Sequence, residues 1–394
     1  MRIAMLLSEP WQTNGVCRVV ESWARILTDA EHDVTLVCEE RGADPELPGC
    51  RVATYRVAET KNRLDRWKGR REALTRSILA LESEAPFDVY LSHDWLPTTC
   101  VRRALPNARL AQTIHSPLVD ENHLNNWQYA PSMRHRALYP ATLAMSWSLE
   151  SQGLRALDRA HTLSEYTWQR LGMRHSRLCR DTPRDRIPGT FDDRRFVPAQ
   201  DRGQVRRDLG LPIEAKILWT VRRLVPRNGV DRIAECARRL RDRNETILFQ
   251  IGGTGPEKDR IQAEIDRLGV GDMVRLVGFV SEETLPAWYQ AADVFLLPTR
   301  ALECFGLPVI EAMACGCVPL IVPDGGPPEL VRDPRLVAST NTDTAFVDLV
   351  ERVVSSDFPL NGERFTDEAH RLYSESAIAP AVLEFVERLN RVRR

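Results

Sequence analysis

The stretch LPTRALECFGLPVIEAMACG, residues 297–316, decides the fold that we expect for this chain. It follows the apolar run 294–297, passes through a loop, and continues into a second apolar segment, 308–314, that begins with proline. Proline suits the first turn of a helix, and a glycine just before it allows close approach of a ligand to the backbone. We therefore predict a strand, a loop that contains Glu303, and a helix that begins near Leu307.

Short apolar runs alternate with amphipathic segments on both sides of this stretch. In the first half the expected strands are 3–7, 34–37, 52–55, 89–91 and 110–114, with helices that include 16–27 and 70–81. In the second half the expected strands are 217–220, 247–251, 274–276, 294–297 and 318–321, with helices that include 230–240, 257–268 and 308–314. Repeated strand–helix units indicate parallel sheets covered on both faces, and two such series indicate two doubly wound α/β domains.

The length of 394 residues also favours two domains of about 150–200 residues each. Segment 181–204 is rich in proline and charge, and we expect the boundary there. The predicted first domain is 1–198 and the second is 199–376. Segment 377–394, with a helix over 378–392, is expected to cross back to the first domain.

Composition narrows the class of protein. Lys and Arg total 54 against 55 for Asp and Glu, and a strong nucleic-acid binder would be more basic, so no nucleic-acid partner is expected. The start of the chain has too short an apolar run for a signal peptide and is predicted to be a buried strand, and no apolar stretch reaches the length of a membrane span. The nine cysteines show no metal-binding spacing and are expected to be reduced core residues of a cytoplasmic protein.

The loop and helix start near Leu307 carry a ligand signal. Backbone N–H groups at residues 305–307 would face an anion such as a diphosphate. Glu303 in the loop and Glu311 about one turn into the helix are two carboxylates that only accept hydrogen bonds, which suits the hydroxyl groups of a sugar and a ribose. The alternative interpretation is one acid that favours the helix dipole and one surface glutamate.

The segment resembles the Glu-x7-Glu motif of the family-4 retaining glycosyltransferases of the GT-B fold. The resemblance covers nearly the whole chain and is densest from 217 to 330. It implies two Rossmann-like domains that face each other across a cleft. It also implies that Glu303 contacts the donor sugar, that Glu311 contacts the ribose, and that the backbone of 305–307 holds sugar and diphosphate. Cys304 stands where many members have glycine, a mild departure.

A second loop, TVRRLVPRNG at 220–229, resembles the family's Gly-Arg-Leu-x-x-x-Lys-Gly pattern. Arg223 matches the arginine that binds the donor phosphates, whereas Asn228 stands where the family usually has lysine. Without a metal the protein itself must stabilise the departing nucleoside diphosphate, and loss of one preorganised donor can cost on the order of a hundredfold in rate. We consider Arg222 and Arg227 as sources of the missing charge, and Asn228 still offers one hydrogen bond.

Three further turns of the second half resemble the family. The turn IGGTGPE at 251–257, which contains Gly253, is similar to its Gly-x-Gly-Pro turn. Segment 278–280, which ends at Val280, lies where the backbone of relatives contacts the nucleobase. Segment 324–329 matches Gly-Gly-x-x-Glu, and we expect a mainly structural role for it.

The first half carries weaker signals. Gly15 closes a turn at 8–15 where relatives often have two glycines. His93 and Asp94 follow a strand and resemble a family His-Asp pair near the acceptor, and His115 matches the family's active-site histidine. A lone histidine is more often structural, but at the carboxyl end of a strand we favour a functional role for His115, and for His93 both interpretations stay open. Ser164 is expected to cap a helix.

The resemblance implies transfer of a hexose-type sugar from a nucleotide-diphosphate sugar to a hydroxyl acceptor, with retention and without metal or cofactor. The acceptor classes considered are a glycan, a lipid-linked glycan and a natural product. The alternatives are a nucleotide-sugar epimerase of GT-B fold and a non-catalytic nucleotide-sugar-binding protein. The expected catalytic residues are His115, Arg223 and Glu303, with His93 and Asp94 on the acceptor side. The expected donor-binding residues are Gly15, Arg223, Asn228, Gly253, Val280, Glu303, Cys304, Phe305, Gly306, Leu307 and Glu311.

A basic cluster lies between positions 61 and 76. Its members are Lys61, Arg63, Arg66, Lys68, Arg70, Arg71 and Arg76, set against Asp65 and Glu72. Such a cluster attracts an anionic lipid or acceptor, which would give weak peripheral contact at the inner face of the membrane. The alternative is an ordinary solvated helix face.

Overall fold

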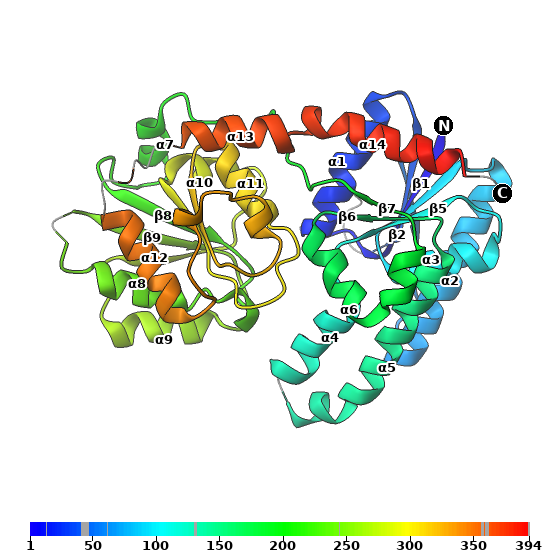
Figure 1. The fold of residues 1–394 in the computed structure, drawn as a ribbon, viewed down its shortest axis with the longest axis horizontal. Coiled ribbons are helices and arrows are strands. Elements are labelled where there is room, and N and C mark those ends of the chain that lie inside the picture. Colours follow the sequence, from blue (N-terminus) through cyan, green and yellow to red (C-terminus); the bar gives the residue numbers. More distant parts are fainter. Residues whose placement is uncertain are drawn as a thin grey trace. The chain divides into compact units, whose positions relative to one another are not determined.

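The computed structural model describes residues 1–12, 14–40, 47–60, 62–129, 132–243, 245–355, 358 and 362–392, without the side chains of 63, 64, 126 and 135. The chain forms two compact units (Figure 1). Unit 1 comprises Met1–Gly189 and Ile378–Arg394, and unit 2 comprises Thr190–Ala377. The division falls inside the expected boundary segment 181–204 but before position 198, and the closing segment groups with unit 1.

Unit 1 is built on a parallel sheet of seven strands in the order β3-β2-β1-β4-β5-β6-β7. The strands are β1 (Arg2–Pro10), β2 (Asp33–Glu39), β3 (Cys50–Tyr55), β4 (Val89–Ser92), β5 (Leu110–Ile114), β6 (Arg159–Thr162) and β7 (Arg184–Arg186). The helices are α1 (Gly15–Asp29), α2 (Arg63–Glu84), α3 (Trp95–Ala104), α4 (Leu118–His123), η1 (Leu124–Gln128), α5 (Met133–Ala156), α6 (Glu165–Asp181) and α14 (Glu375–Asn390), which begins at the end of unit 2.

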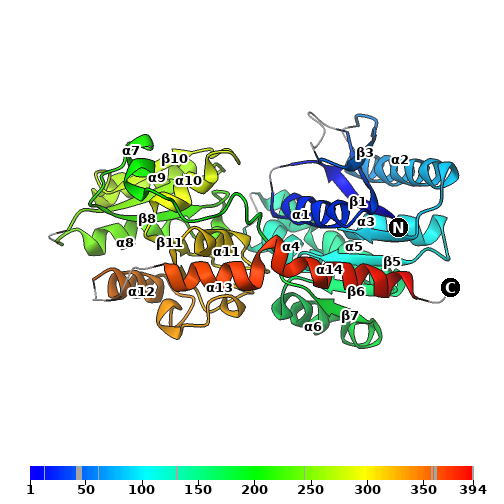
Figure 2. The same ribbon diagram turned by 90° about the horizontal axis from the view of Figure 1, so that it is seen from above.

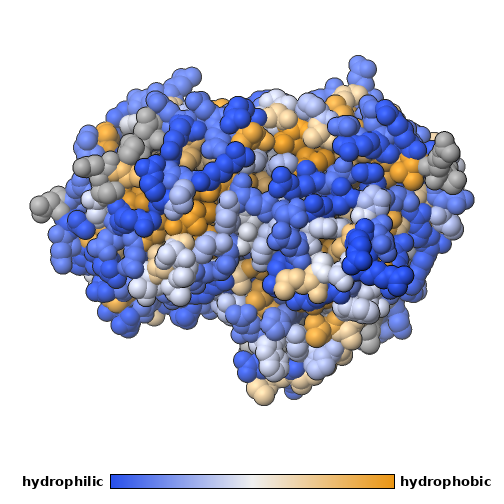
Figure 3. All heavy atoms as spheres, viewed as in Figure 1, coloured by the Kyte–Doolittle hydropathy of each residue, from blue (hydrophilic) through white to orange (hydrophobic). Residues whose placement is uncertain are grey.

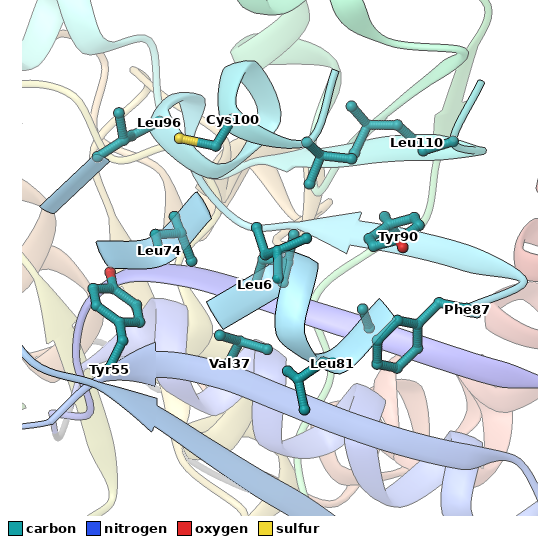
Figure 4. Packing of buried hydrophobic residues seen from close by; sticks show 14 of the residues in the cluster. Leu6, Val37, Tyr55, Leu74, Leu81, Phe87, Tyr90, Leu96, Cys100 and Leu110 are labelled. Carbon is teal, nitrogen blue, oxygen red and sulfur yellow. The ribbon is translucent and has the colours of Figure 1, made fainter. Parts of the chain in front are cut away.

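The core of unit 1 lies where α2 and α3 pack against the sheet. Figure 4 shows Leu74 of α2 and Cys100 of α3 close to Leu6 and Leu110 of the strands. On another helix, α1, the buried residues Val19, Trp23 and Ile26 recur at helical spacing, so α1 buries one apolar stripe. Trp23 meets Phe385 of α14 edge to face, with ring centroids 5.7 Å apart, which joins the last helix to unit 1.

Unit 2 is built on a parallel sheet of five strands in the order β10-β9-β8-β11-β12. The strands are β8 (Lys216–Val221), β9 (Ile247–Gly252), β10 (Val274–Gly278), β11 (Val294–Leu297) and β12 (Val318–Ile321). The helices are α7 (Arg202–Asp208), η2 (Pro226–Asn228), α8 (Arg232–Leu240), α9 (Lys258–Leu268), α10 (Leu285–Ala291), α11 (Leu307–Ala314), η3 (Pro327–Glu329), η4 (Pro334–Leu336), α12 (Asp343–Ser355) and α13 (Glu363–Tyr373). Helices α8, α9 and α12 pack together on one face, and α7, α10, α11 and α13 on the other (Figures 1 and 2).

Both sheets therefore have the doubly wound topology that the sequence predicts. Strands β11 and β12 are buried along their whole length, as their continuous apolar sequences predict for a parallel sheet covered on both faces. In each sheet the strand order reverses beside the first strand, between β1 and β4 in unit 1 and between β8 and β11 in unit 2. Ligands of such sheets bind at the carboxyl ends of the strands at this switch point.

The face drawn in Figure 3 is mainly hydrophilic, with apolar residues interspersed, including over the region where Figure 1 draws α4 and α5. Large apolar side chains are exposed there at Trp127, Met133 and Leu138. Across the described residues, no helix combines the length and the apolar character that crossing a membrane requires.

Candidate active site

The switch point of unit 2 brings together two loops that are far apart in sequence. Arg222 directly follows β8, and the loop that contains Glu303 follows β11. Nη2 of Arg222 donates to Oε2 of Glu303 at 2.5 Å and to Oδ1 of Asn228 at 3.2 Å. The two side chains of the ion pair are only 12% and 15% exposed. The structure thus places a carboxylate, a guanidinium and an amide at the edge of the sheet where a ligand is expected.

The backbone of Arg222 is fixed by the neighbouring strand end. Its N–H donates to the carbonyl of Gly252 at 3.0 Å, and a Cβ on Gly253 would lie 1.9 Å from the Arg222 carbonyl oxygen. Gly253, at φ +117°, therefore has to be glycine both for its conformation and for this contact. Its own N–H donates to Gly278 at 2.6 Å. Gly253, predicted as a donor-binding residue, supports the loop that carries Arg222.

Asn228 is buried and closes the loop that follows β8. Its Nδ2 donates to the carbonyl of Arg223 at 2.7 Å, while its Oδ1 accepts from Arg222. The next residue, Gly229, lets this loop lie directly against the loop that follows β11, because a Cβ at this position would lie 2.0 Å from the carbonyl oxygen of Pro298. The carbonyl of Arg227 accepts from the N–H groups of residues 300 and 301, at 2.7 and 3.2 Å. The loops that follow β8 and β11 are therefore held together by backbone contacts.

The Glu303 loop has an unusual backbone that a neighbouring turn supports. Leu302 has φ +55°, a conformation that side chains other than glycine rarely adopt and that often occurs at functional sites. The N–H of Gly326 donates to the carbonyl of Glu303 at 2.8 Å, and a Cβ on Gly326 would lie 2.3 Å from the carbonyl oxygen of Cys304. The turn 324–329 therefore supports the loop, in agreement with the structural role expected for it.

Helix α11 begins directly after this loop. Its N-cap, Gly306, has φ +101° and no side-chain cap. Pro308 has no N–H and the N–H of Val309 donates to the carbonyl of Gly306 at 2.8 Å, so Leu307 supplies the uncapped N–H at the helix start. The two neighbours of Gly306, Phe305 and Leu307, are buried, and Cys304 is buried as well. Glu311 is buried within the helix and accepts a hydrogen bond from the hydroxyl of Tyr289 at 3.0 Å. This partner lies on α10, and no motif of the sequence pointed to it.

The other predicted residues of unit 2 lie nearer the surface. Arg223 is exposed, and its side chain makes no hydrogen bond or ion pair with any residue that the structure describes. Val280 is partly buried close to Gly252, which itself packs against Trp219. Trp219 stacks on Trp288 with ring centroids 5.0 Å apart. The backbone around Val280 is thus held by an aromatic core.

At the switch point of unit 1, Asp94 joins two elements. Its Oδ1 accepts from the N–H of Leu96 at the start of α3, and its Oδ2 accepts from the N–H of Ser8 near the end of β1. Burial raises the pKa of Asp94 to about 6. Gly15, the first residue of α1, is exposed, and Asn14 before it caps the helix through Cys17 N–H at 2.9 Å. Both carboxylate oxygens of Asp94 therefore accept backbone bonds, which suits a positioning residue.

Histidines gather after and within the neighbouring strands. Nδ1 of His93 and Nε2 of His115 are 3.1 Å apart and share one hydrogen bond, with the rings stacked. His161 of β6 donates from Nε2 to the carbonyl of Ile187 at 2.9 Å, so its Nδ1 accepts from the hydroxyl of Thr113 at 3.0 Å. The predicted pair His93 and His115 is brought together, and His161 is a neighbour that sequence reasoning missed.

These imidazoles are neutral near pH 7. Burial and the neighbouring His115 hold the pKa of His93 well below its usual value. Burial lowers the pKa of His115 to about 3 and that of His161 to about 4. Nε2 of His93 is buried without a hydrogen-bond partner among the described residues. His115 is therefore a neutral imidazole near pH 7, and its Nε2 is already engaged by His93.

Three described members of the basic cluster of the first half have partners within unit 1. Arg70 binds Glu39 at 2.5 Å, and Arg66 lies 3.7 Å from the same carboxylate. Arg71 lies over the ring of Trp67 at 5.3 Å. Lys68 and Arg76 are exposed, whereas Lys61 and the side chain of Arg63 fall outside what the structure describes. The charge available to an anionic surface is therefore smaller than the sequence indicates.

Within the described residues, one acidic group has spacing that would fit a metal ion, Asp192, Asp193 and Glu375. Arg194 lies 3.1 Å from Asp192 and 3.8 Å from Glu375, and the hydroxyl of Ser376 donates to Asp193 at 2.7 Å. These carboxylates already have partners and lie outside the loops that follow β8 and β11. All nine cysteines are free, and all but Cys50 are buried, as expected for small core residues.

The two halves of the chain match two glycosyltransferase families. Residues 13–177 match the family described as Glycosyltransferase Family 4, and residues 201–372 match Glycosyl transferases group 1. A mannosyltransferase of Mycolicibacterium smegmatis, described as GDP-mannose-dependent and acting on phosphatidylinositol monomannoside, is 32% identical over 177 residues, 43% of this chain and 46% of that protein. D-inositol 3-phosphate glycosyltransferase of Streptomyces scabiei is 34% identical over 197 residues, 47% of this chain and 43% of that protein. The matches thus span less than half the length of these curated relatives.

Solved structures show the same fold over the whole chain. Sucrose-phosphate synthase from Thermosynechococcus elongatus superposes with a TM-score of 0.82 at 20% identity and covers 98% of both chains. HepE from Anabaena, solved with UDP-glucose, superposes with a TM-score of 0.76 at 15% identity and covers 98% of this chain and 100% of that one. Family matches in both halves and the two parallel-sheet domains lead to one conclusion: the chain belongs to glycosyltransferase family 4 and has the GT-B fold.

Proposed function

We propose that this protein transfers a hexose-type sugar from a nucleotide-diphosphate sugar to a hydroxyl acceptor, with retention of anomeric configuration and without a metal ion or cofactor. The observation that carries the proposal is the Arg222–Glu303 pair, held at 2.5 Å beside the uncapped start of α11. Oε1 of Glu303 remains available to accept from sugar hydroxyls. Backbone N–H groups and the helix dipole at Gly306 and Leu307 stabilise the diphosphate.

In the proposed mechanism the donor binds to unit 2, with its ribose at Glu311 and its base near Val280. The acceptor binds to unit 1, near His93, Asp94 and His115. Arg223 is exposed and its side chain has no partner among the residues that the structure describes, so it can stabilise the charge that grows on the leaving diphosphate. Retention requires no protein nucleophile when the acceptor attacks from the face that the diphosphate leaves, and the leaving phosphate then receives the hydroxyl proton. His115, neutral at pH 7, positions the acceptor or the sugar.

The relatives support the donor class. The mycobacterial relative is described as GDP-mannose-dependent, and HepE was solved with UDP-glucose. The base and the sugar of the donor therefore have to be found by screening. We also propose a cytoplasmic location, with weak contact to an anionic surface through exposed Lys68 and Arg76. Flotation with anionic liposomes at low salt tests that contact, and wild-type protein that stays unbound would refute it.

The experiment for the main proposal is a thermal-shift screen with UDP-, GDP-, ADP- and dTDP-sugars, because a ligand that binds the native state raises its apparent stability. The stabilising donor is then incubated with acceptors in EDTA, and the anomeric configuration of the product is determined by NMR. Transfer with retention is expected. Isomerised donor in the absence of acceptor would establish an epimerase, and binding without any turnover would establish a non-catalytic binder.

A further inference from the structure

We propose that Arg222 supplies the cation for the donor diphosphate that position 228 lacks, so that residues 222 and 228 have exchanged roles in this chain. The inference rests on the proposed function, because it assigns a residue to the donor site. It goes beyond the family pattern Gly-Arg-Leu-x-x-x-Lys-Gly, in which residue 222 corresponds to glycine and residue 228 to lysine. Here the first position has gained a cation and the second has lost one.

The first observation is an unused donor. Nη1 of Arg222 is buried and has no hydrogen-bond partner among the described residues. A buried guanidinium N–H without a partner is costly, and such groups in native structures often face a ligand. The other terminal nitrogen, Nη2, is bonded to Glu303, which fixes the plane of the guanidinium in the loop pair where the diphosphate is expected. The unused N–H group of Nη1 therefore belongs to the pair of loops in which we expect the diphosphate to bind.

The second observation is that Asn228 and Arg222 touch. Oδ1 of Asn228 accepts from Nη2 of Arg222 at 3.2 Å, and its amide nitrogen is committed to the carbonyl of Arg223. A lysine at 228 would place an ammonium against this guanidinium in a buried position, which is unfavourable for two like charges. A neutral acceptor at 228 is thus what an arginine at 222 requires. The two departures from the family pattern are explained by one contact.

The third observation concerns two other arginines near the loops, Arg232 and Arg300. Arg232 is buried and bound to Asp343 at 2.7 Å and to the carbonyl of Pro298 at 3.1 Å. Arg300 forms ion pairs with Asp231 and Asp343. Both arginines are thus engaged in contacts within the scaffold of unit 2. Arg222 and Arg223 then form the pair of cations that a metal-free diphosphate site needs.

The arrangement also joins the two parts of the donor site. When Nη1 donates to a phosphate oxygen, Nη2 still holds the Glu303 carboxylate in place for the sugar hydroxyls. Arg222 is therefore both a diphosphate ligand and a positioning residue for Glu303. This predicts that its loss weakens recognition of the diphosphate more than recognition of the nucleoside.

The test compares the affinity for a nucleoside diphosphate with that for its monophosphate. Calorimetry with UDP, GDP, ADP and dTDP and their monophosphates first identifies the nucleotide that wild-type protein prefers. Arg222→Gln is expected to lower the diphosphate-to-monophosphate preference by about tenfold or more, since a charge-assisted hydrogen bond is lost. The double variant Arg222→Gly with Asn228→Lys is expected to restore the preference, whereas Asn228→Lys alone is expected to weaken diphosphate binding. Arg227→Gln is the matched control and keeps the wild-type ratio.

An unchanged preference in Arg222→Gln, or a preference lost in Arg227→Gln instead, would overturn the inference. Thermal unfolding checks that each variant is folded, and Arg222→Lys replaces Arg222→Gln if the latter does not fold. Arg222→Lys keeps the positive charge and is expected to retain part of the preference for the diphosphate. A complete wild-type ratio in Arg222→Lys would show that Arg222 has no specific role. If wild-type protein binds none of the four diphosphates, the proposed function itself fails, which is a different result.

Discussion

Nη2 of Arg222 and Oε2 of Glu303 lie 2.5 Å apart, although 81 positions separate these residues in the sequence. Each stands just beyond one of the two strands that flank the switch point of unit 2, β8 and β11. The parallel topology therefore creates the pair, and glycines at 229, 253 and 326 let the surrounding loops approach closely enough to hold it.

Gly326→Ala is expected to displace the Glu303 loop. The added Cβ would lie 2.3 Å from the carbonyl oxygen of Cys304, and backbone has to move to relieve that contact. The φ of Gly326 is −78°, which alanine adopts readily, so the effect is steric. We expect a loss of about 1–3 kcal/mol in the free energy of unfolding, and at least a tenfold fall in kcat/KM for the donor.

The matched control is Gly172→Ala in α6, where an added Cβ meets nothing within 4 Å. This variant should be as stable as wild type or slightly more so, because alanine favours a helix. Urea unfolding and donor kinetics of both variants check the prediction. Equal behaviour of the two would show that the turn at 324–329 does not support the site.

His115→Ala is expected to lower kcat by about tenfold or more with little change in the affinity for the nucleoside diphosphate. The reason is that His115 belongs to unit 1, whereas the nucleotide is assigned to unit 2. His123→Ala is the control, since His123 lies on α4 and bonds Tyr139. A large loss of nucleotide affinity in His115→Ala, measured by calorimetry, would place the histidine in the nucleotide site instead.

Stability is expected to fall as the pH is lowered from about 6.5 to about 4, in part through His161. The native pKa of about 4 lies below the usual 6.5, so the unfolded chain binds a proton first and protonation favours unfolding. The shift corresponds to at most about 3 kcal/mol at low pH. Asp94 acts in the opposite direction, because its raised pKa of about 6 lets the native state bind a proton first.

His161→Gln separates the two effects. Glutamine keeps a donor for the carbonyl of Ile187 but does not titrate, so the variant should lose less stability than wild type over the same pH range. Asp94 contributes equally to both proteins and cancels in the comparison. Chemical denaturation at a series of pH values provides the measurement, and parallel curves for the two proteins would contradict the assignment.

Much of the fold follows from apolar runs. The predicted bounds of β5, β11 and β12 agree with the structure, and all three strands are buried along their whole length. Strands β11 and β12 are continuous apolar runs, whereas β5, LAQTI, also contains the buried polar residues Gln112 and Thr113. Strands β6 and β7 were not predicted. The first is only RAHT with a buried histidine, and the second is RDR, so neither shows the apolar pattern that marks a buried strand.

The residues of the candidate site could be predicted from the sequence only in part, for a similar reason. Motif spacing pointed to Glu303, Asn228 and Arg223, and it offered Arg222 only as one of two possible sources of the missing charge. Adjacent residues of an extended chain point to opposite sides, and only the fold shows that Arg222 turns inward to Glu303 while Arg223 faces solvent. The bond from Tyr289 to Glu311 depends on the packing of α10 against α11, which no local pattern specifies.

The most direct measurement of the central claim is donor turnover by Glu303→Gln. With the donor identified by screening, an accepting hydroxyl compound and EDTA, release of nucleoside diphosphate and formation of the glycoside are followed for wild type, Glu303→Gln and the surface control Glu264→Gln. We predict metal-free transfer by wild type and by Glu264→Gln, and a loss of at least about a hundredfold in Glu303→Gln with its thermal unfolding unchanged. Near-normal turnover by folded Glu303→Gln would contradict the account.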